Sequence, residues 1–589
     1  MRRMLGLSIS NVEFLSAEDD RVLLSLDSLE LAAGSVYGVV APNLSGRSIL
    51  LRLLGDAALA GSPRSRIGEK RIAWESGTSP LGADAPGIYL GPCPQDSVST
   101  LTATVEEELA LHRKARYGDI AGPFSANTDL VDALMLSACL KQDPLCLSGG
   151  QTAALALLCA LEMKRPILCV DETLAHLDVS LRPVAWRAVR EFARAGHICL
   201  MADNEYDLMA EYADYAIILD GGQVKGIHRV DQAFNSVEAK LRGTIPSVTS
   251  LTASICPQLE ALPVRYEQMV SLLRASPNGF RKSRVPEIGN DARKTQDIAP
   301  GGESSLVFDG LCFTYPGSDG RPALAEASAA LPLGHTTGLI GSIGAGKSTL
   351  CKTLNGVLRA QRGGITFGGK PVAPFGHPGQ LVAYSFQNPD DQLFQDTVEK
   401  EVAFGPRCLG LTPSEISAGV SIACDLFGLA SLKRAHPLDL PFVLRKRVAM
   451  AAAVAMQRPF TVLDEPTVTQ DQSFRAHLLD VIECLTGQGR SLILISHDAE
   501  FAFEACDRIL VMSQGRCCWS GTREEFCAGR PDEAEGFVNL AVRLSGELDF
   551  SPVCPTRQAL TDRLRSQRFG RSSFQPGEHG CDSGDDGPP

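Results

Sequence analysis

Residues Gly341 to Thr349 have the types and spacing that bind phosphate groups. They match the pattern G-x-x-x-x-G-K-[ST], with Lys347 and Ser348 at its last two fixed positions. In this pattern the backbone N–H groups surround phosphate oxygens, the lysine reaches the β- and γ-phosphates, and the hydroxyl binds Mg²⁺. We therefore predict a nucleoside triphosphate site formed by Gly341, Ser342, Gly344, Ala345, Gly346, Lys347, Ser348 and Thr349.

The elements on either side of this loop are those that would position it. The apolar run Thr337–Ile340 predicts a buried strand before the loop, and Leu350–Leu354 predicts the first turns of a helix after it. A second apolar run ends in Asp464 and Glu465. An aspartate at such a strand end can hold Mg²⁺, and a glutamate can polarise the attacking water. The sequence therefore predicts hydrolysis of the bound triphosphate.

Both motifs have a second copy in the N-terminal half of the chain. Residues 31–50 resemble residues 331–350, and Arg165–Glu172 resembles Arg458–Glu465, which lies 293 residues later. Because the two copies keep the same motif order, we predict a repeat of one α/β fold. Each copy should contain a mostly parallel sheet with its phosphate loop at the strand ends.

The composition indicates a globular protein with several domains. The chain has 589 residues, of which 44% are hydrophobic and 21% charged. It contains no run of about 18 apolar residues, so we expect it neither to span a membrane nor to be exported. The net charge of −13 argues against a nucleic-acid partner. Eighteen scattered cysteines without a C-x-x-C pair favour reduced thiols over a metal cluster.

The peptide Leu147–Gln151 reads L-S-G-G-Q and ends 20 residues before Asp171. In this position it resembles the signature peptide of ATP-binding-cassette (ABC) ATPases, and the shared motifs cover both halves of the chain. The resemblance implies two P-loop domains, each with a RecA-like sheet, an antiparallel β subdomain and a helical subdomain. It also implies head-to-tail pairing, in which each ATP lies between the phosphate loop of one domain and the signature peptide of the other.

The same resemblance implies roles for individual residues. The catalytic residues would be Glu465, His497 and Lys347, with the histidine and the lysine stabilising the γ-phosphate. Mg²⁺ would be held by Ser348, Gln387 and Asp464. The remaining contacts to ATP would be the adenine-stacking Tyr315 and, from the other module, Ser148, Gly149, Gly150 and Gln151.

The two modules carry complementary departures from the family pattern. The first loop has Ala41, Leu44 and Arg47 in place of two glycines and the lysine, and Asp203 or a neighbour stands where a histidine is expected. Added Cβ atoms obstruct the close approach of phosphate to the backbone. In the second module the peptide aligned with the signature, Leu440–Leu444, reads L-P-F-V-L, and its proline lacks an N–H. Crosswise pairing within one chain therefore predicts one complete site and one doubly degenerate site.

The chain is predicted to divide into four segments. These are a first ABC domain at residues 1–240, a linker with little core at 241–303 that includes one helical stretch, Pro263–Arg274, a second ABC domain at 304–545, and a disordered tail at 546–589.

A longer run points to one branch of the family. Phe386–Phe394 followed by Thr397–Pro406 resembles the ATPases of energy-coupling-factor transporters, the vitamin and cobalt/nickel importers. This implies a subunit that uses ATP and Mg²⁺ at the cytoplasmic face of the cell membrane, bound to a T-type membrane subunit and a substrate-binding S-type subunit. A sugar-import twin cassette and a soluble, non-transport ABC ATPase are the alternatives. The N-P-D-D-Q-L-F run argues against the first, and a linker that is neither basic nor long-helical argues against the second.

Overall fold

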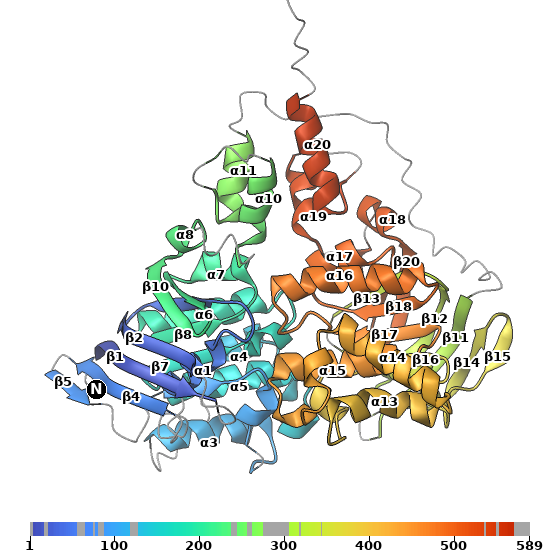
Figure 1. The fold of residues 1–589 in the computed structure, drawn as a ribbon, viewed down its shortest axis with the longest axis horizontal. Helices are drawn as coiled ribbons and strands as arrows, with labels where there is room; N and C mark the ends of the chain where they lie inside the picture. The colour runs from blue at the N-terminus through green and yellow to red at the C-terminus, as the bar shows by residue number, and fades with distance from the viewer. Residues whose placement is uncertain are drawn as a thin grey trace, which may run out of the picture.

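The computed structural model shows two α/β modules side by side, with a group of helices above their boundary (Figure 1). The chain is described at residues 4–16, 22–55, 65–74, 77–80, 87–99, 101–117, 128–236, 244–255, 259, 262–274, 305–316, 320–342, 344–529, 531–534, 537–548 and 553–569. Among these residues no helix is both long and apolar enough to cross a membrane. The cysteines described are free thiols, as their scatter in the sequence predicts.

Module one is built on one ten-stranded sheet, in the order β5-β4-β1-β2-β10-β9-β3-β8-β7-β6. The antiparallel strands β5, β4, β1 and β2 join the rest of the sheet through a single residue pair, Gln223 of β10 with Ser25 of β2. The central strands are uniformly buried, which explains their continuous apolar sequence. The strands are β1 Met4–Leu15, β2 Val22–Ala32, β3 Val36–Val40, β4 Ser65–Trp74, β5 Gly77–Pro80, β6 Gly87–Leu90, β7 Ile167–Asp171, β8 Ile198–Ala202, β9 Tyr215–Asp220 and β10 Gln223–Arg229.

Module two separates the same two parts into distinct sheets. A four-stranded antiparallel sheet has the order β12-β11-β14-β15, and a six-stranded sheet has the order β16-β17-β18-β13-β19-β20. In the second sheet β16, β17, β18, β13 and β19 run parallel. The strands are β11 Ser305–Phe313, β12 Leu324–Pro332, β13 Thr336–Ile340, β14 Arg362–Phe367, β15 Lys370–Val372, β16 Val382–Ser385, β17 Phe460–Asp464, β18 Ser491–Ile495, β19 Arg508–Ser513 and β20 Arg516–Thr522.

Helices complete each module in corresponding places. In module one they are α1 Arg47–Gly55, α3 Val105–Tyr117, α4 Thr128–Ala133, α5 Gly149–Met163, α6 Arg182–Arg194, α7 Tyr206–Tyr212 and α8 Val230–Ala233. In module two they are α12 Lys347–Asn355, α13 Val398–Cys408, α14 Pro413–Leu426, α15 Phe442–Ala455, α16 Gln472–Gly487, α17 Ala499–Ala505 and α18 Arg523–Ala528. The α/β repeat predicted from the sequence is therefore present. In each module a group of helices precedes the strand that ends in the two carboxylates, α3 to α5 before β7 and α13 to α15 before β17.

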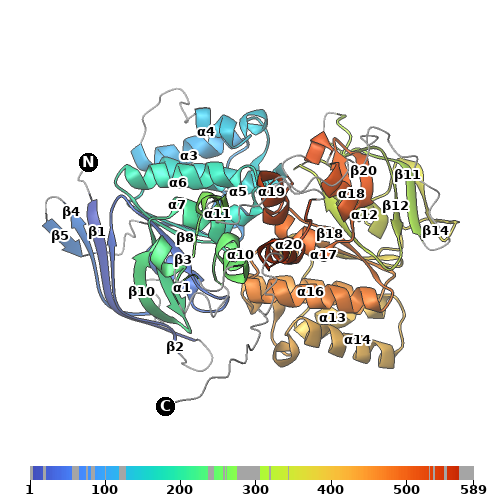
Figure 2. The same cartoon turned by 90° about the horizontal axis from the view of Figure 1, so that it is seen from above.

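The linker was predicted to contain one helical stretch, Pro263–Arg274, and a helix is present there, but a second linker helix and a helix in the tail were not predicted. Parts of both segments form helices, α10 Ser247–Ile255 and α11 Tyr266–Arg274 in the linker and α20 Arg557–Phe569 in the tail, which pack with α19 Leu540–Glu547 around one apolar cluster. Figure 2 shows α10, α19 and α20 together at the boundary between the modules. Residues 275–303 and the chain beyond residue 569 lie outside the described residues.

The internal repeat accounts for this bundle. α10 begins 293 residues before α19, the same offset that relates the carboxylate strands, so the helices end two equivalent modules. Each helix has apolar residues one turn apart, such as Leu251 with Ile255 and Leu544 with Leu548. These short stripes are buried where helices from both modules meet, so neither segment alone predicts a core.

Candidate nucleotide site

The phosphate loop of module two has the geometry that its sequence predicts. It leaves β13 after Ile340, and α12 begins at Lys347. Gly341 and Gly346 have φ values of 150° and 99°, and a Cβ on either would lie within 2.4 Å of a backbone carbonyl oxygen. The Lys347 Nζ donates hydrogen bonds to the carbonyls of Gly341 (2.6 Å) and Ser342 (3.0 Å). Burial lowers the pKa of this lysine, while nearby Glu465 favours its charged form.

Asp464 at the end of β17 faces this loop. Its Oδ2 accepts hydrogen bonds from Ser348 Oγ at 3.0 Å and from the Tyr384 hydroxyl at 2.6 Å. Burial and the adjacent carboxylate raise the pKa of Tyr384. Ser348, Asp464 and Gln387 line one cavity, which gives the hydroxyl, carboxylate and amide oxygens that a hard cation such as Mg²⁺ prefers. Tyr384 lies on the neighbouring strand β16, and no sequence motif had pointed to it.

Glu465 and His497 meet at the ends of adjacent strands. Glu465 has a φ of 50°, a left-handed conformation that is uncommon for a glutamate, and its carboxylate accepts the backbone N–H of His497 at 3.1 and 3.3 Å. Burial raises the pKa of Glu465. The His497 Nε2 lies 3.5 Å from Glu465 Oε1, and its Nδ1 lies 3.0 Å from Oδ1 of Asp178 in module one. The histidine is thus held between carboxylates of both modules.

The signature peptide of module one faces the same region. Ser148 caps α5, and its side chain forms a capping box with Gln151. A Cβ built on Gly149 would lie 3.6 Å from Gln387 Nε2, so this glycine adjoins the other module. A cavity of about 290 Å³ has a lining shared by the two modules, including Leu147, Gly149, Ser348, Gln387 and Asp464.

Tyr315 lies beside this cavity rather than among its lining residues. It follows β11, its hydroxyl is 3.3 Å from Thr349 Oγ1, and its ring packs edge-on against Phe313. The structure therefore brings Gly149 and Asp178 of module one against the segments of module two that carry Gln387, Asp464, Glu465 and His497, with the aromatic ring at the margin. We call this place the complete site.

The first loop has a different internal chemistry. The Arg47 guanidinium is buried and forms an ion pair with Glu172. It also donates a hydrogen bond to Asn204 Oδ1 at 3.1 Å, and Asn204 Nδ2 donates to Glu172 at 2.9 Å. Burial raises the pKa of Glu172, and Arg47 acts in the opposite direction. Because Asn204 lies 293 residues before His497, it is the neighbour of Asp203 that occupies the histidine position.

This loop also contacts the opposite module directly. The Asn43 backbone N–H donates to Asp471 Oδ2 at 2.9 Å, and its side-chain amide donates to the Thr469 carbonyl at 3.0 Å. The adjoining Leu44 has a φ of 62° and is exposed. The interface is therefore closed on this side by protein hydrogen bonds.

The aligned peptide of module two lies opposite that loop. Pro441 precedes α15 without a side-chain cap, and Phe442 is buried with Arg445 stacked over its ring at 5.5 Å. A cavity of about 800 Å³ is lined by both Ser48 of the first loop and Pro441. We call this region the degenerate site. Its two halves belong to different modules, as crosswise pairing predicts.

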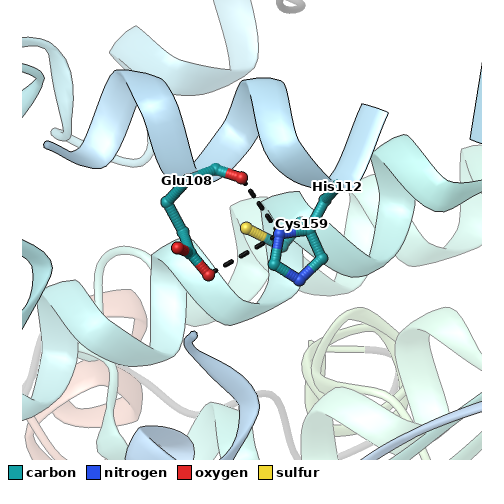
Figure 3. Close-up of side chains that lie close together, drawn as sticks. All are labelled: Glu108, His112 and Cys159. Carbon is teal, nitrogen blue, oxygen red and sulfur yellow. Dashed lines mark hydrogen bonds and ion pairs between the residues drawn. The ribbon is translucent and has the colours of Figure 1, made fainter. Parts of the chain in front are cut away.

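A cluster of metal-ligating residue types lies outside both sites. Glu108 and His112 on α3 and Cys159 on α5 bring a carboxylate, an imidazole and a thiol within 4.8 Å of one another (Figure 3). The Glu108 carboxylate already accepts three hydrogen bonds of 2.6 Å from Ser99 and Thr102. In module two the equivalent glutamate, Glu401, caps the same loop through Phe394 and Gln395. The cluster therefore has a structural explanation.

Comparison with known proteins defines the class. Residues 324–468 match the family model described as ABC transporter. A putative ABC transporter ATP-binding protein of Streptomyces avermitilis is 40% identical over 227 residues, 38% of this chain and 84% of that protein. A protein of the same description from Methanosarcina acetivorans is 30% identical over 423 residues, covering 68% of this chain and 67% of its own length.

Two further similarities carry more specific names. The energy-coupling factor transporter ATP-binding protein EcfA2 of Methanospirillum hungatei is 38% identical over 227 residues, 38% of this chain and 56% of that protein. A solved structure of cbiO1 from Clostridium perfringens, described as part of the ABC transporter complex cbiONQ, is 31% identical and covers 41% of this chain and 97% of its own, with a TM-score of 0.34. The chain belongs to the ATP-hydrolysing ATP-binding proteins of ABC transporters.

Proposed function

We propose that this chain is the ATPase subunit of an energy-coupling-factor importer and hydrolyses ATP at the complete site alone. The observation that carries the single site is the contact of Asp178 in module one with His497 in module two, together with the approach of the signature residue Gly149 to Gln387. The importer type is supported by the Phe386–Phe394 run and by the relatives named for energy-coupling and cbiONQ transporters. Its cargo would be a metal ion or a vitamin-like nutrient.

The residues of the complete site would share the work as follows. Lys347 exchanges the carbonyls of Gly341 and Ser342 for phosphate oxygens, and the N–H groups of the loop and of the α5 N-terminus surround the phosphates. Bound Mg²⁺ neutralises phosphate charge, and Ser348, Gln387 and Asp464 would hold it. Tyr315 would contact adenine.

Proton movement falls to the paired groups at the strand ends. Glu465 is placed to orient the attacking water and accept its proton, which burial favours because it raises the pKa of the carboxyl group. His497 would donate to the γ-phosphate. The Asp178 carboxylate beside its Nδ1 orients the ring, so the imidazole is aimed by the opposite module.

Two exposed apolar pairs supply a surface for a membrane subunit. In module two, Phe394 and Phe404 are 60% and 40% exposed, with ring centroids 4.7 Å apart. Their counterparts 293 residues earlier, Leu101 and Leu111, are 84% and 36% exposed. Helices α3 and α13, which carry one member of each pair, lie along the same edge of the molecule (Figure 1). We propose that a T-type subunit docks apolar helices here, joined by an S-type subunit, at the cytoplasmic face of the membrane.

Reconstitution tests this proposal. The chain is co-expressed with T- and S-type membrane subunits of the metal and vitamin importer classes, and complexes are recovered in detergent. We expect a stable complex whose ATPase activity rises in liposomes, and expect F394S/F404S to lose the complex while keeping basal hydrolysis. Selective binding to the membrane subunits of a sugar importer would point to the twin-cassette alternative.

A further inference from the structure

Lys446 is a buried cation in the helix that has lost its signature peptide. It lies on α15 and is only 1% exposed. Its Nζ donates to three backbone carbonyls, those of Phe386 (2.9 Å), Gln387 (2.7 Å) and Asp464 (2.6 Å). An ammonium group has three donors, so all of them are used on segments outside its own helix.

The three carbonyls belong to the segments of the complete site that would hold Mg²⁺. Phe386 and Gln387 begin the loop that leaves β16. The Asp464 carbonyl forms the peptide bond to Glu465, the candidate base. One side chain therefore ties the loop of one metal ligand to the strand end that carries another ligand and the base. Burying this charge is costly, and only the three carbonyls and the nearby carboxylates of Asp464 and Glu465 compensate it, so the lysine is better explained by a role at this site than by packing alone.

Module one lacks this tie. The residue 293 positions earlier on α5 is Ala153. There His176 Nε2 lies 2.8 Å from the carbonyl of Pro92, which holds the corresponding loop by a different side chain. The lysine thus occurs in the module whose phosphate loop is intact.

We propose that Lys446 is a positioning residue for hydrolysis, which fixes Gln387 and the Asp464–Glu465 peptide so that they can hold Mg²⁺ and water together. The helix α15 would then serve the site of its own module, although its N-terminus no longer completes a site across the interface. This inference rests on the proposed function of the complete site.

The test compares K446M with K446R and with a matched control, R490M. Arg490 is also a partly buried cation that donates to a carbonyl of α15, that of Val454 at 2.9 Å, and it has no bond to the site. For each variant we would measure turnover, the Mg²⁺ concentration for half-maximal activity, the affinity for a fluorescent ATP analogue in EDTA, and thermal stability.

We expect K446M to raise the Mg²⁺ requirement and lower turnover by about tenfold or more, the usual effect of losing a group that orients metal ligands. Analogue affinity in EDTA should stay within about twofold, K446R should recover part of the activity, and R490M should change stability only.

If K446M matches R490M in its Mg²⁺ dependence and turnover, Lys446 is a core residue and the inference fails. If K446M does not fold, K446Q, which keeps two donors, decides by the same criteria. If the wild-type chain does not turn over ATP, the proposed function fails, and the Mg²⁺-dependent gain in analogue affinity still tests Lys446.

Discussion

The two composite sites differ most in what holds their cation. In the complete site Lys347 rests on two backbone carbonyls, which it can exchange for phosphate oxygens. In the degenerate site Arg47 is paired with Glu172, so a nucleotide would have to break a buried ion pair and leave a carboxylate unpaired. Breaking such a pair costs about 3–5 kcal/mol. A degenerate site can thus replace the negative charge of its ligand with a carboxylate of its own chain.

The segments that cross the interface follow the same division. Asp178 of module one reaches His497, a candidate catalytic group, whereas the equivalent Asp471 of module two accepts a hydrogen bond from Asn43. The contact of Asp178 with His497 can respond to bound nucleotide, because His497 is a candidate γ-phosphate ligand. The contact of Asp471 with Asn43 only joins one module to the other. We therefore expect closure of the modules to be driven by ATP on one side and to be permanent on the other.

The largest expected effect is that of Glu465→Gln. Loss of a general base should lower turnover by about a hundredfold or more, while ATP remains bound. The matched change Glu172→Gln should leave turnover within about twofold, because the ion pair with Arg47 keeps Glu172 from acting as a general base. Steady-state ATPase rates of the purified chain, taken well below both melting temperatures, check this pair. Equal losses would overturn the asymmetry.

Ser148→Arg should come next, although it lies about 200 residues from the loop that it affects. The large side chain would stand at the N-terminus of α5, where the γ-phosphate should bind, and would obstruct closure. Loss of contacts at such a site costs about 3 kcal/mol, or about a hundredfold in rate. Analogue affinity should change little, because Lys347 and Tyr315 belong to module two. A wild-type rate in a monomeric preparation would mean that the signature comes from another molecule.

Asp178→Asn should have an intermediate effect. The variant keeps the shape of the side chain but removes the charge beside His497 Nδ1, so the ring loses part of its orientation and turnover should fall by about tenfold. Asp471→Asn is the control because it retains an oxygen to cap α16 and its hydrogen-bond partner in the other module is Asn43, not a candidate catalytic group. Comparable rates for the two variants would contradict a functional difference between the crossing contacts.

The motifs predicted the parts of this comparison that depend on local backbone geometry. The strand, loop and helix around Lys347 follow from a fixed pattern of glycines, and the pairing of Gly149 with the opposite module follows from the signature peptide. The ion pair of Arg47 with Glu172 could not be predicted from a motif, because it joins residues 125 positions apart. The sequence presented Arg47 only as a missing lysine, and no spacing rule links it to its partner.

The same limit explains what else was missed. Tyr384 and Lys446 each reach Asp464 from another element, through contacts that no pattern within one segment encodes. The helical bundle requires four short segments from both modules at once, two of which are rich in proline, serine and polar residues. Tertiary packing decided these features, whereas composition alone favoured a tether with one helix and a disordered tail.

Arg47→Met should change stability more than activity. Removing the guanidinium leaves Glu172 buried without its partner, so the free energy of unfolding should fall by about 3 kcal/mol, while ATP turnover stays near the wild-type rate. The double variant R47M/E172Q should recover part of the loss, since the unpaired charge is then gone. Denaturant titration without nucleotide measures the free energies. A large loss of turnover without a change in stability would show that Arg47 acts on nucleotide instead.

The smallest expected effect on activity belongs to Pro441→Ser, which restores the second residue of the signature pattern. Phe442 and Val443 still occupy the glycine positions, and the loop opposite keeps Arg47 in its ion pair, so no second site should form. Serine is a good N-cap and proline offers no side-chain acceptor here, so α15 should gain about 0.5–1 kcal/mol of stability instead. Thermal unfolding and ATPase rates, together with equilibrium dialysis of labelled ATP, separate these outcomes. We expect one ATP per chain and an unchanged rate. Binding of a second ATP would mean that the degenerate site was closed by its peptide and not by the pairing of Arg47 with Glu172.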